Sequence, residues 1–178
     1  MRRDQRSSLA CERLESRDTP SAGSLDTVFG SAGKVLDTHL DGPTKAMVVQ
    51  ADGKIITAGY TKDAAGKNLA AVARYNADGT PDTEFDTDGI QTVSFSSRPG
   101  GFTSVVVQSD GKIVLAGDDG MLARVVRLNA DGSLDTTFDG DGMNQAALSG
   151  STGTFVAADA AVTSDGKIVV AGTFTAEE

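Results

Sequence analysis

Short apolar and β-branched runs separated by polar turns cover most of the chain. The first clear instance is residues 47–59 (MVVQADGKIITAG), in which an Asp-Gly pair lies between two β-branched runs. This arrangement predicts a β-hairpin, because glycine adopts the positive φ angle that a tight turn needs. The same pattern returns at residues 105–117 and 160–172. The sequence therefore predicts three hairpins of similar design.

Further strands are expected on either side of these hairpins. Apolar runs at residues 69–75 and 122–128 predict a strand after each of the first two hairpins, and residues 33–38 and 89–95 predict one before them. Four short strands per unit, with turns about every 8–12 residues, are typical of all-β folds and suggest the blades of a β-propeller. The near-continuous apolar string at residues 113–115 favours a central strand covered on both faces.

Three motifs recur in the same order, about 55 residues apart, which is the signature of tandem repeats. An LDTxF-like string begins each unit, a DGK string lies at the hairpin turn, and NADG ends the first two units. We therefore divide the chain into an N-terminal segment, residues 1–23, and a repeat region, residues 24–178. The repeat units are residues 24–79, 80–132 and 133–178.

The expected fold is all-β, a partial β-propeller of about two and a half four-stranded antiparallel blades. The third unit is shorter, because nothing after Phe174 matches the strand at residues 69–75. Closed propellers usually have about four to eight blades, so two sheet faces are expected to be open. The chain could be part of a longer protein, which we favour, or it could self-associate through its open blade faces or stack as an open solenoid.

Composition narrows the choice of partners. The net charge is −9, glycine is frequent at 21 residues, and aromatic residues make up only 5%. Such an acidic surface repels a phosphate backbone and anionic lipid, so we expect neither nucleic acid nor membrane binding. No apolar run is long enough to insert across a membrane. The single cysteine, Cys11, excludes an intrachain disulfide and a cysteine-based metal site.

The order LDTxF, Gly-x-Val, DGKIVVAG and ARYNADGSLDTTF resembles the delta-60 repeat of bacterial proteins. The resemblance covers residues 24–178 and implies a β-propeller in an exported or cell-surface protein, without a shared enzymatic activity. Residues 11–22 (CERLESRDTPSA) are similar to a short N-terminal segment of predicted surface proteins from one bacterial lineage. That likeness implies a flexible sorting or anchoring segment at residues 1–23, and a plain mixed-charge N-terminus is the alternative.

Acidic turns are the one feature that could bind a cofactor. Asp86 and Asp88 follow the LDTxF motif of the second unit, and Asp139 and Asp141 follow that of the third. Alternating aspartates with a glycine turn can place oxygens around Ca²⁺, so these four residues are the candidate metal ligands. The alternative, which we favour, is that each Asp-x-Asp-Gly string only forms a turn.

The remaining candidates point to structure rather than catalysis. The sole histidine, His39, has no counterpart in the other units, and no nucleophile-elbow, phosphate-loop or zinc-protease motif is present. Phe29, Phe85 and Phe138 recur with the repeat, and we expect them to pack between neighbouring blades.

The sequence therefore predicts a non-enzymatic repeat module of a bacterial surface or exported protein, serving as a scaffold or as a binding platform for an unidentified protein or glycan. We expect no cofactor, with Ca²⁺ as the exception to test. Two alternatives stay open. One is a calcium-dependent adhesion module, and the other is a fragment of a propeller enzyme whose active residues lie elsewhere.

Overall fold

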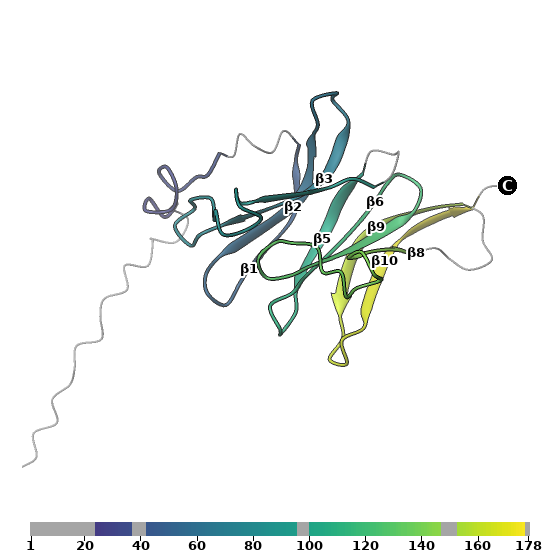
Figure 1. The fold of residues 1–178 in the computed structure, drawn as a ribbon. Helices are drawn as coiled ribbons and strands as arrows, with labels where there is room; N and C mark the ends of the chain where they lie inside the picture. Colours follow the sequence, from purple (N-terminus) through teal and green to yellow (C-terminus); the bar gives the residue numbers. More distant parts are fainter. Residues whose placement is uncertain (1–23, 37–41, 96–99, 147–152, 177–178) are drawn as a thin grey trace, which may run out of the picture.

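The computed structural model describes residues 24–36, 42–95, 100–146 and 153–176. Within these ranges the chain forms ten strands and no helix (Figure 1). The strands are β1 (Thr44–Val49), β2 (Ile55–Lys62), β3 (Asn68–Tyr75), β4 (Ile90–Val93), β5 (Gly101–Val107), β6 (Ile113–Asp118), β7 (Ala123–Leu128), β8 (Met143–Ala146), β9 (Gly153–Val162) and β10 (Ile168–Ala176). The described residues thus contain no helix that is long and apolar enough to cross a membrane.

The strands form three antiparallel sheets that follow one another along the chain. The first has the order β1-β2-β3-β4, the second β5-β6-β7-β8, and the third contains β9 and β10. Each sheet begins with a hairpin whose turn holds the DGK motif, with Gly53, Gly111 and Gly166 at φ angles of 81–86°. The three predicted hairpins and the predicted fold class are confirmed.

The sheets are displaced from the sequence units by one strand. β4 belongs to the second unit by sequence, but it pairs with β3 of the first, with Ala70 opposite Val93 and Ala73 opposite Ile90. β8 pairs with β7 in the same way. The expectation that residues 89–95 open the sheet of their own unit is therefore wrong, because the segment between β3 and β4 returns the chain to the free edge of β3.

The predicted strand at residues 33–38 has a different outcome. Its described part, residues 33–36, contains only an isolated bridge between Gly30 and Lys34. In the second unit the matching residues complete the preceding sheet as β4. Among the described residues no sheet precedes strand β1, so residues 33–36 pair with no strand edge there.

The Ala-Gly pair that ends each DGK motif marks a β-bulge. The register shifts opposite Gly59 and Gly117, and it shifts again at Gly172. A Cβ atom at these glycines would collide with the backbone oxygen of Pro43, Gly101 or Val156 on the neighbouring strand. Glycine is required there because the two backbones approach too closely for a side chain.

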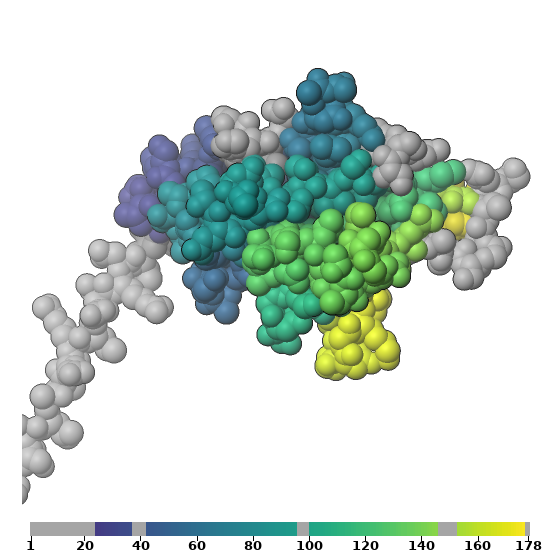
Figure 2. Space-filling view, viewed as in Figure 1, coloured from purple at the N-terminus to yellow at the C-terminus, as the bar shows by residue number. Residues whose placement is uncertain are grey.

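The sheets stack in sequence order, with the blue first sheet and the yellow third sheet on either side of the second (Figure 1). In the space-filling view the purple N-terminal and yellow C-terminal residues of the described chain lie apart (Figure 2). The main core lies between the first two sheets and contains residues of both, such as Ile56, Val72, Phe102 and Leu115. β9 covers the opposite face of the second sheet by packing on β5 and β6. Residues 113–117 of β6 are consequently all buried, which confirms the prediction of a strand covered on both sides.

Candidate functional site

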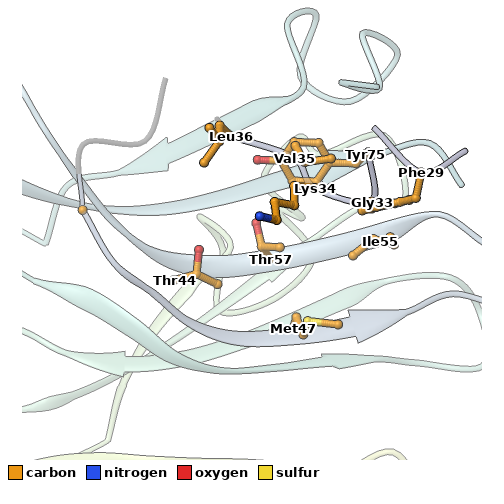
Figure 3. A pocket seen from close by; sticks show the side chains of 11 residues that line it. Phe29, Gly33, Lys34, Val35, Leu36, Thr44, Met47, Ile55, Thr57 and Tyr75 are labelled. Atoms are coloured by element: carbon orange, nitrogen blue, oxygen red, sulfur yellow. The ribbon is translucent and has the colours of Figure 1, made fainter. Parts of the chain in front are cut away.

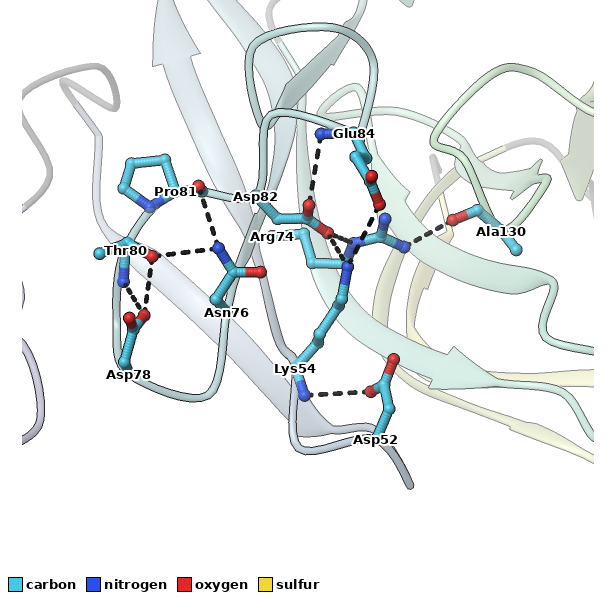
Figure 4. A network of polar contacts seen from close by, with 10 residues as sticks. All are labelled: Asp52, Lys54, Arg74, Asn76, Asp78, Thr80, Pro81, Asp82, Glu84 and Ala130. Atoms are coloured by element: carbon cyan, nitrogen blue, oxygen red, sulfur yellow. Dashed lines mark hydrogen bonds and ion pairs between the residues drawn. The ribbon is translucent and has the colours of Figure 1, made fainter.

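A buried ion cluster lies at the end of the first sheet (Figure 4). Asp82 Oδ2 accepts a hydrogen bond from Lys54 Nζ at 2.7 Å and from Arg74 Nε at 2.6 Å. The side chains of Asp82 and Arg74 are only 4% and 8% exposed, whereas that of Lys54 is 24% exposed. The carboxylate is therefore enclosed by two cations, one buried and one reaching toward solvent.

The repeat motifs place these three side chains. Lys54 is the lysine of the DGK motif, and Arg74 lies near the end of β3. The NADG turn then reverses the chain, so that Asp82 contacts both cations. The backbone N–H of Asp82 donates to the carbonyl of Arg74 at 2.9 Å, which fixes the position of the aspartate. Burial by itself raises the pKa of Asp82, but hydrogen bonds from Lys54 and Arg74 outweigh it, and the pKa lies below its ordinary range.

The second sheet repeats this cluster. Asp135 Oδ2 accepts from Lys112 Nζ at 2.7 Å and from Arg127 Nε at 2.6 Å. The hydrogen bond from Lys112, followed by those from Thr137 and Arg127, holds the pKa of Asp135 well below its usual range. We call each Lys–Asp–Arg set a triad. The third unit supplies only the lysine, Lys167, whose described partner is the exposed Asp165.

A second set of contacts joins the first sheet to the turn that follows the second. Arg74 Nη1 donates to the carbonyl of Ala130 at 2.5 Å, and the N–H of Asp86 donates to the carbonyl of Asp131 at 2.8 Å. Gly132 lies against the ring of Phe85, so closely that a Cβ atom would come within 2.9 Å of it. Arg74 thus serves both the triad and the contact between sheets.

The second and third sheets are also joined by polar contacts. Ser104 Oγ donates to Asp159 Oδ1 at 2.6 Å and accepts the N–H of Ala160 at 3.1 Å. The bond from Ser104 and the N–H of Ala160 lower the pKa of Asp159 despite some desolvation. Neighbouring sheets are therefore held together by directed hydrogen bonds in addition to apolar packing.

The recurring phenylalanines behave as expected where sheets enclose them. Phe85 is fully buried, with the Arg74 guanidinium 4.7 Å above its ring. Phe138 has Arg127 at 4.8 Å in the same arrangement but is only half-buried. Phe29 is also half-buried and lies against Gly79 of its own NADG turn. The packing role predicted for this position is confirmed for Phe85.

The four candidate calcium ligands lie in two separate turns. Asp88 accepts the N–H of Ile90 and Asp141 accepts that of Met143, each at 2.9 Å. Asp139 accepts from the side chain of Asn144. Among the described residues, no three histidine, cysteine, aspartate or glutamate side chains are grouped closely enough to hold a metal ion. Calcium binding stays a prediction.

The backbone at Asp86 and Asp139 supports the turn interpretation. Their φ angles are 46° and 52°, close to the 56° of Gly30 at the same place in the first unit. Aspartate tolerates this left-handed conformation better than most residues. Burial, followed by the charges of Asp88 and Asp131, raises the pKa of Asp86. Cys11 and His39 lie outside the described residues.

The triad cations are what the sequence reasoning missed. Arg74 and Arg127 interrupt apolar strands, and each unit that contains such an arginine also has a DGK lysine and a following LDTxF aspartate. That joint recurrence was a usable signal, because a charge inside a buried strand requires a partner. The ion pair between Arg124 Nη2 and Asp119 Oδ2, at 2.6 Å, has no counterpart in the first unit, so no recurrence indicated it.

A hollow of about 380 Å³ opens on the outer face of the first sheet (Figure 3). Its wall combines the loop at residues 29–36 with apolar side chains of β1 to β3. The lining residues are Phe29, Gly33, Lys34, Val35, Leu36, Gly42, Thr44, Met47, Ile55, Thr57 and Tyr75. Thr57 Oγ1 is buried there without a hydrogen-bond partner among the described residues.

A family model described as a β-propeller domain of unknown function, DUF5122, matches residues 50–85, 108–138 and 163–177. The first two matched segments each contain one complete triad, and the third contains only Lys167. The chain is a partial β-propeller. Its blades are blade 1 (β1–β4), blade 2 (β5–β8) and the two-stranded blade 3 (β9–β10). No curated protein matches the chain.

Proposed function

We propose that this chain is a non-enzymatic β-propeller module of a bacterial surface or exported protein, acting as a scaffold or binding platform. The observation that carries the proposal is the use of the repeating polar residues. The LDTxF aspartate, the DGK lysine and the strand arginine bind one another in two triads. These residues serve blade structure, and the two aspartates, whose side chains are 3–4% exposed, are shielded from a substrate.

Further support comes from the turns. Asp52, Asp63, Asp78 and Asp131 each accept the backbone N–H of a residue two positions later, at 2.9–3.0 Å. Aspartates in such turns stabilise the loop and keep the surface charged. These four aspartates therefore have a structural role in turns, which is consistent with a repeat fold that acts as a scaffold. The surface location rests on the resemblance of the repeat and of residues 11–22.

Assays of turnover and of location test this proposal separately. The purified chain is incubated with glycans, carboxylic esters and phosphate esters, and no turnover above the buffer blank is expected. Turnover at enzyme-like rates would overturn the non-enzymatic part. Protease shaving of intact cells that produce the protein is expected to degrade it, and full protection in intact but not in lysed cells would overturn the surface location.

Calcium-dependent adhesion is the second candidate, favoured by one observation. The raised pKa of Asp86 reflects desolvation and repulsion from Asp88 and Asp131, which a bound cation would relieve. Calorimetric titration with Ca²⁺ tests it, with Asp86→Asn as the variant expected to lose any heat. Absence of heat and of a thermal shift at millimolar Ca²⁺ would end this candidate.

A further inference from the structure

The two outermost faces of the described blades are uncovered, whereas each inner face is covered by a neighbouring blade. Met47, Val105 and Ala160 occupy the same position of the repeat and point toward the preceding blade. Val105 and Ala160 are each 9% exposed, whereas Met47 is 64% exposed. All three positions thus belong to a surface that can contact a preceding blade. Within the described residues, this surface is exposed only on blade 1.

The opposite face shows the same relation. Ile56, Val114 and Val169 are equivalent and point toward the following blade. Ile56 and Val114 are fully buried, but Val169 is 52% exposed. Blade 3 therefore presents the apolar side chains that blades 1 and 2 insert into their neighbours.

The hollow on blade 1 is equivalent to the surface of blade 2 that blade 1 covers. Its lining positions Met47, Ile55, Thr57 and Tyr75 correspond to four buried core residues of blade 2, namely Val105, Ile113, Leu115 and Leu128. In Figure 3 these side chains line one concave surface together with the loop at residues 29–36. On blade 2, the same surface is filled by the first sheet, including Ile56 and Ala58.

We propose that the open face of blade 3 in one copy of this chain docks onto the open face of blade 1 in a second copy, head to tail. Val169 and Ala171 of β10, which are equivalent to Ile56 and Ala58, enter the hollow beside Met47 and Ile55. The proposal deepens the scaffold function proposed above and rests on it. The occupant is identified by the internal repeat, because the same two surfaces already meet between blades 1 and 2.

This contact is heterologous, since two different faces meet. Such contacts close into rings when the rotation allows, and otherwise continue as filaments. Each copy has three sheets, so two copies would bring together six, which lies within the range of about four to eight blades in closed propellers. A dimer that closes into a ring through two such contacts would leave neither apolar face in water.

Sedimentation velocity and light scattering of the 178-residue chain test the proposal across roughly 1 to 100 μM, the range in which a micromolar contact becomes visible. The wild-type chain is expected to assemble. Met47→Asp and Val169→Asp each place a charge in the apolar contact and are expected to weaken assembly at least about tenfold. Both residues are exposed, so circular dichroism should show an unchanged fold. Ala64→Asp, at an exposed position in the turn between β2 and β3, should assemble like wild type.

Mixing the two defective variants tests the head-to-tail polarity. Met47→Asp retains an intact blade 3 face and Val169→Asp an intact blade 1 face, so an equimolar mixture should form a heterodimer. A wild-type chain that is monomeric over the whole concentration range would overturn the proposal. So would a result in which Met47→Asp weakens assembly but Val169→Asp does not. The two proposals can fail separately. Enzymatic turnover would refute the proposed non-enzymatic function but would not change the sedimentation result. A monomeric chain would refute the docking of two copies but not the proposed function.

Discussion

Replacing Asp82 with asparagine removes the charge of the first triad while keeping the side-chain shape. Arg74, 8% exposed, would then be a nearly buried cation without its carboxylate, and Lys54, 24% exposed, could turn to water. Breaking a buried ion pair typically costs about 3–5 kcal/mol. Since Lys54 can escape and Arg74 keeps the carbonyl of Ala130, we expect a loss of about 3 kcal/mol, at the lower end of that range.

Urea unfolding followed by circular dichroism measures this loss as a shift of the midpoint at constant slope. The matched control is Glu84→Gln. Glu84 is the other carboxylate near Lys54, at 3.9 Å, but its side chain is 86% exposed. Exposed pairs contribute about 1 kcal/mol or less. If Asp82→Asn cost no more than Glu84→Gln, the triad would not be a stabilising element and the reasoning would fail.

The same variant should change the response to acid. Because the pKa of Asp82 is lower in the folded chain than in the unfolded chain, the unfolded chain binds more protons as the pH falls toward the folded pKa. The free energy of unfolding should therefore decrease as the pH drops below about 4. Asp82→Asn should reduce this decrease without abolishing it, since Asp119 and Asp135 also have lowered pKa values.

Three further outcomes are expected. Gly132→Ala should lower the free energy of unfolding by about 2–3 kcal/mol, because it combines a strained φ of +92° with a collision against Phe85. Gly66→Ala, which has open space around it, should cost about 1 kcal/mol, and equal losses in urea unfolding would contradict the close contact. Phe85→Ala should lower the free energy of unfolding, measured in urea, by about 3–5 kcal/mol, and the same change at the half-buried Phe138 should cost less than half as much. The reverse order would refute the enclosure of Phe85 between blades. Ca²⁺ should leave the thermal midpoint unchanged if the turn at Asp86 is purely structural, and a rise that Asp86→Asn removes would instead establish a calcium site.

The hairpins were predictable because their signal is local. An Asp-Gly pair between β-branched runs specifies both the turn and the direction of the next strand, as at residues 47–59. The strand at residues 90–93 was also predicted, but it was assigned to the wrong sheet. Apolar spacing identifies a strand, whereas its neighbour depends on which edge the preceding turn exposes.

The triads show where reasoning from single residues ends. Lys54 and Asp82 are 28 positions apart and meet only because β2, β3 and the NADG turn bring them together. Comparing the units as wholes would have shown that lysine, arginine and aspartate recur together. The exposure of Met47 was foreseeable only as a property of the end of a stack, since its sequence position matches the buried Val105.

The stacking of consecutive repeats as face-to-face sheets is tested most directly by the contact between Phe85 and Gly132. Proton NMR of the chain should show nuclear Overhauser effects between the Phe85 ring and the α-protons of Gly132, whose resonances should be displaced by the ring current. Phe85→Leu should return those resonances to ordinary positions. Gly132 α-protons at ordinary shifts in the wild-type chain, without a signal linking them to Phe85, would contradict the stacked arrangement.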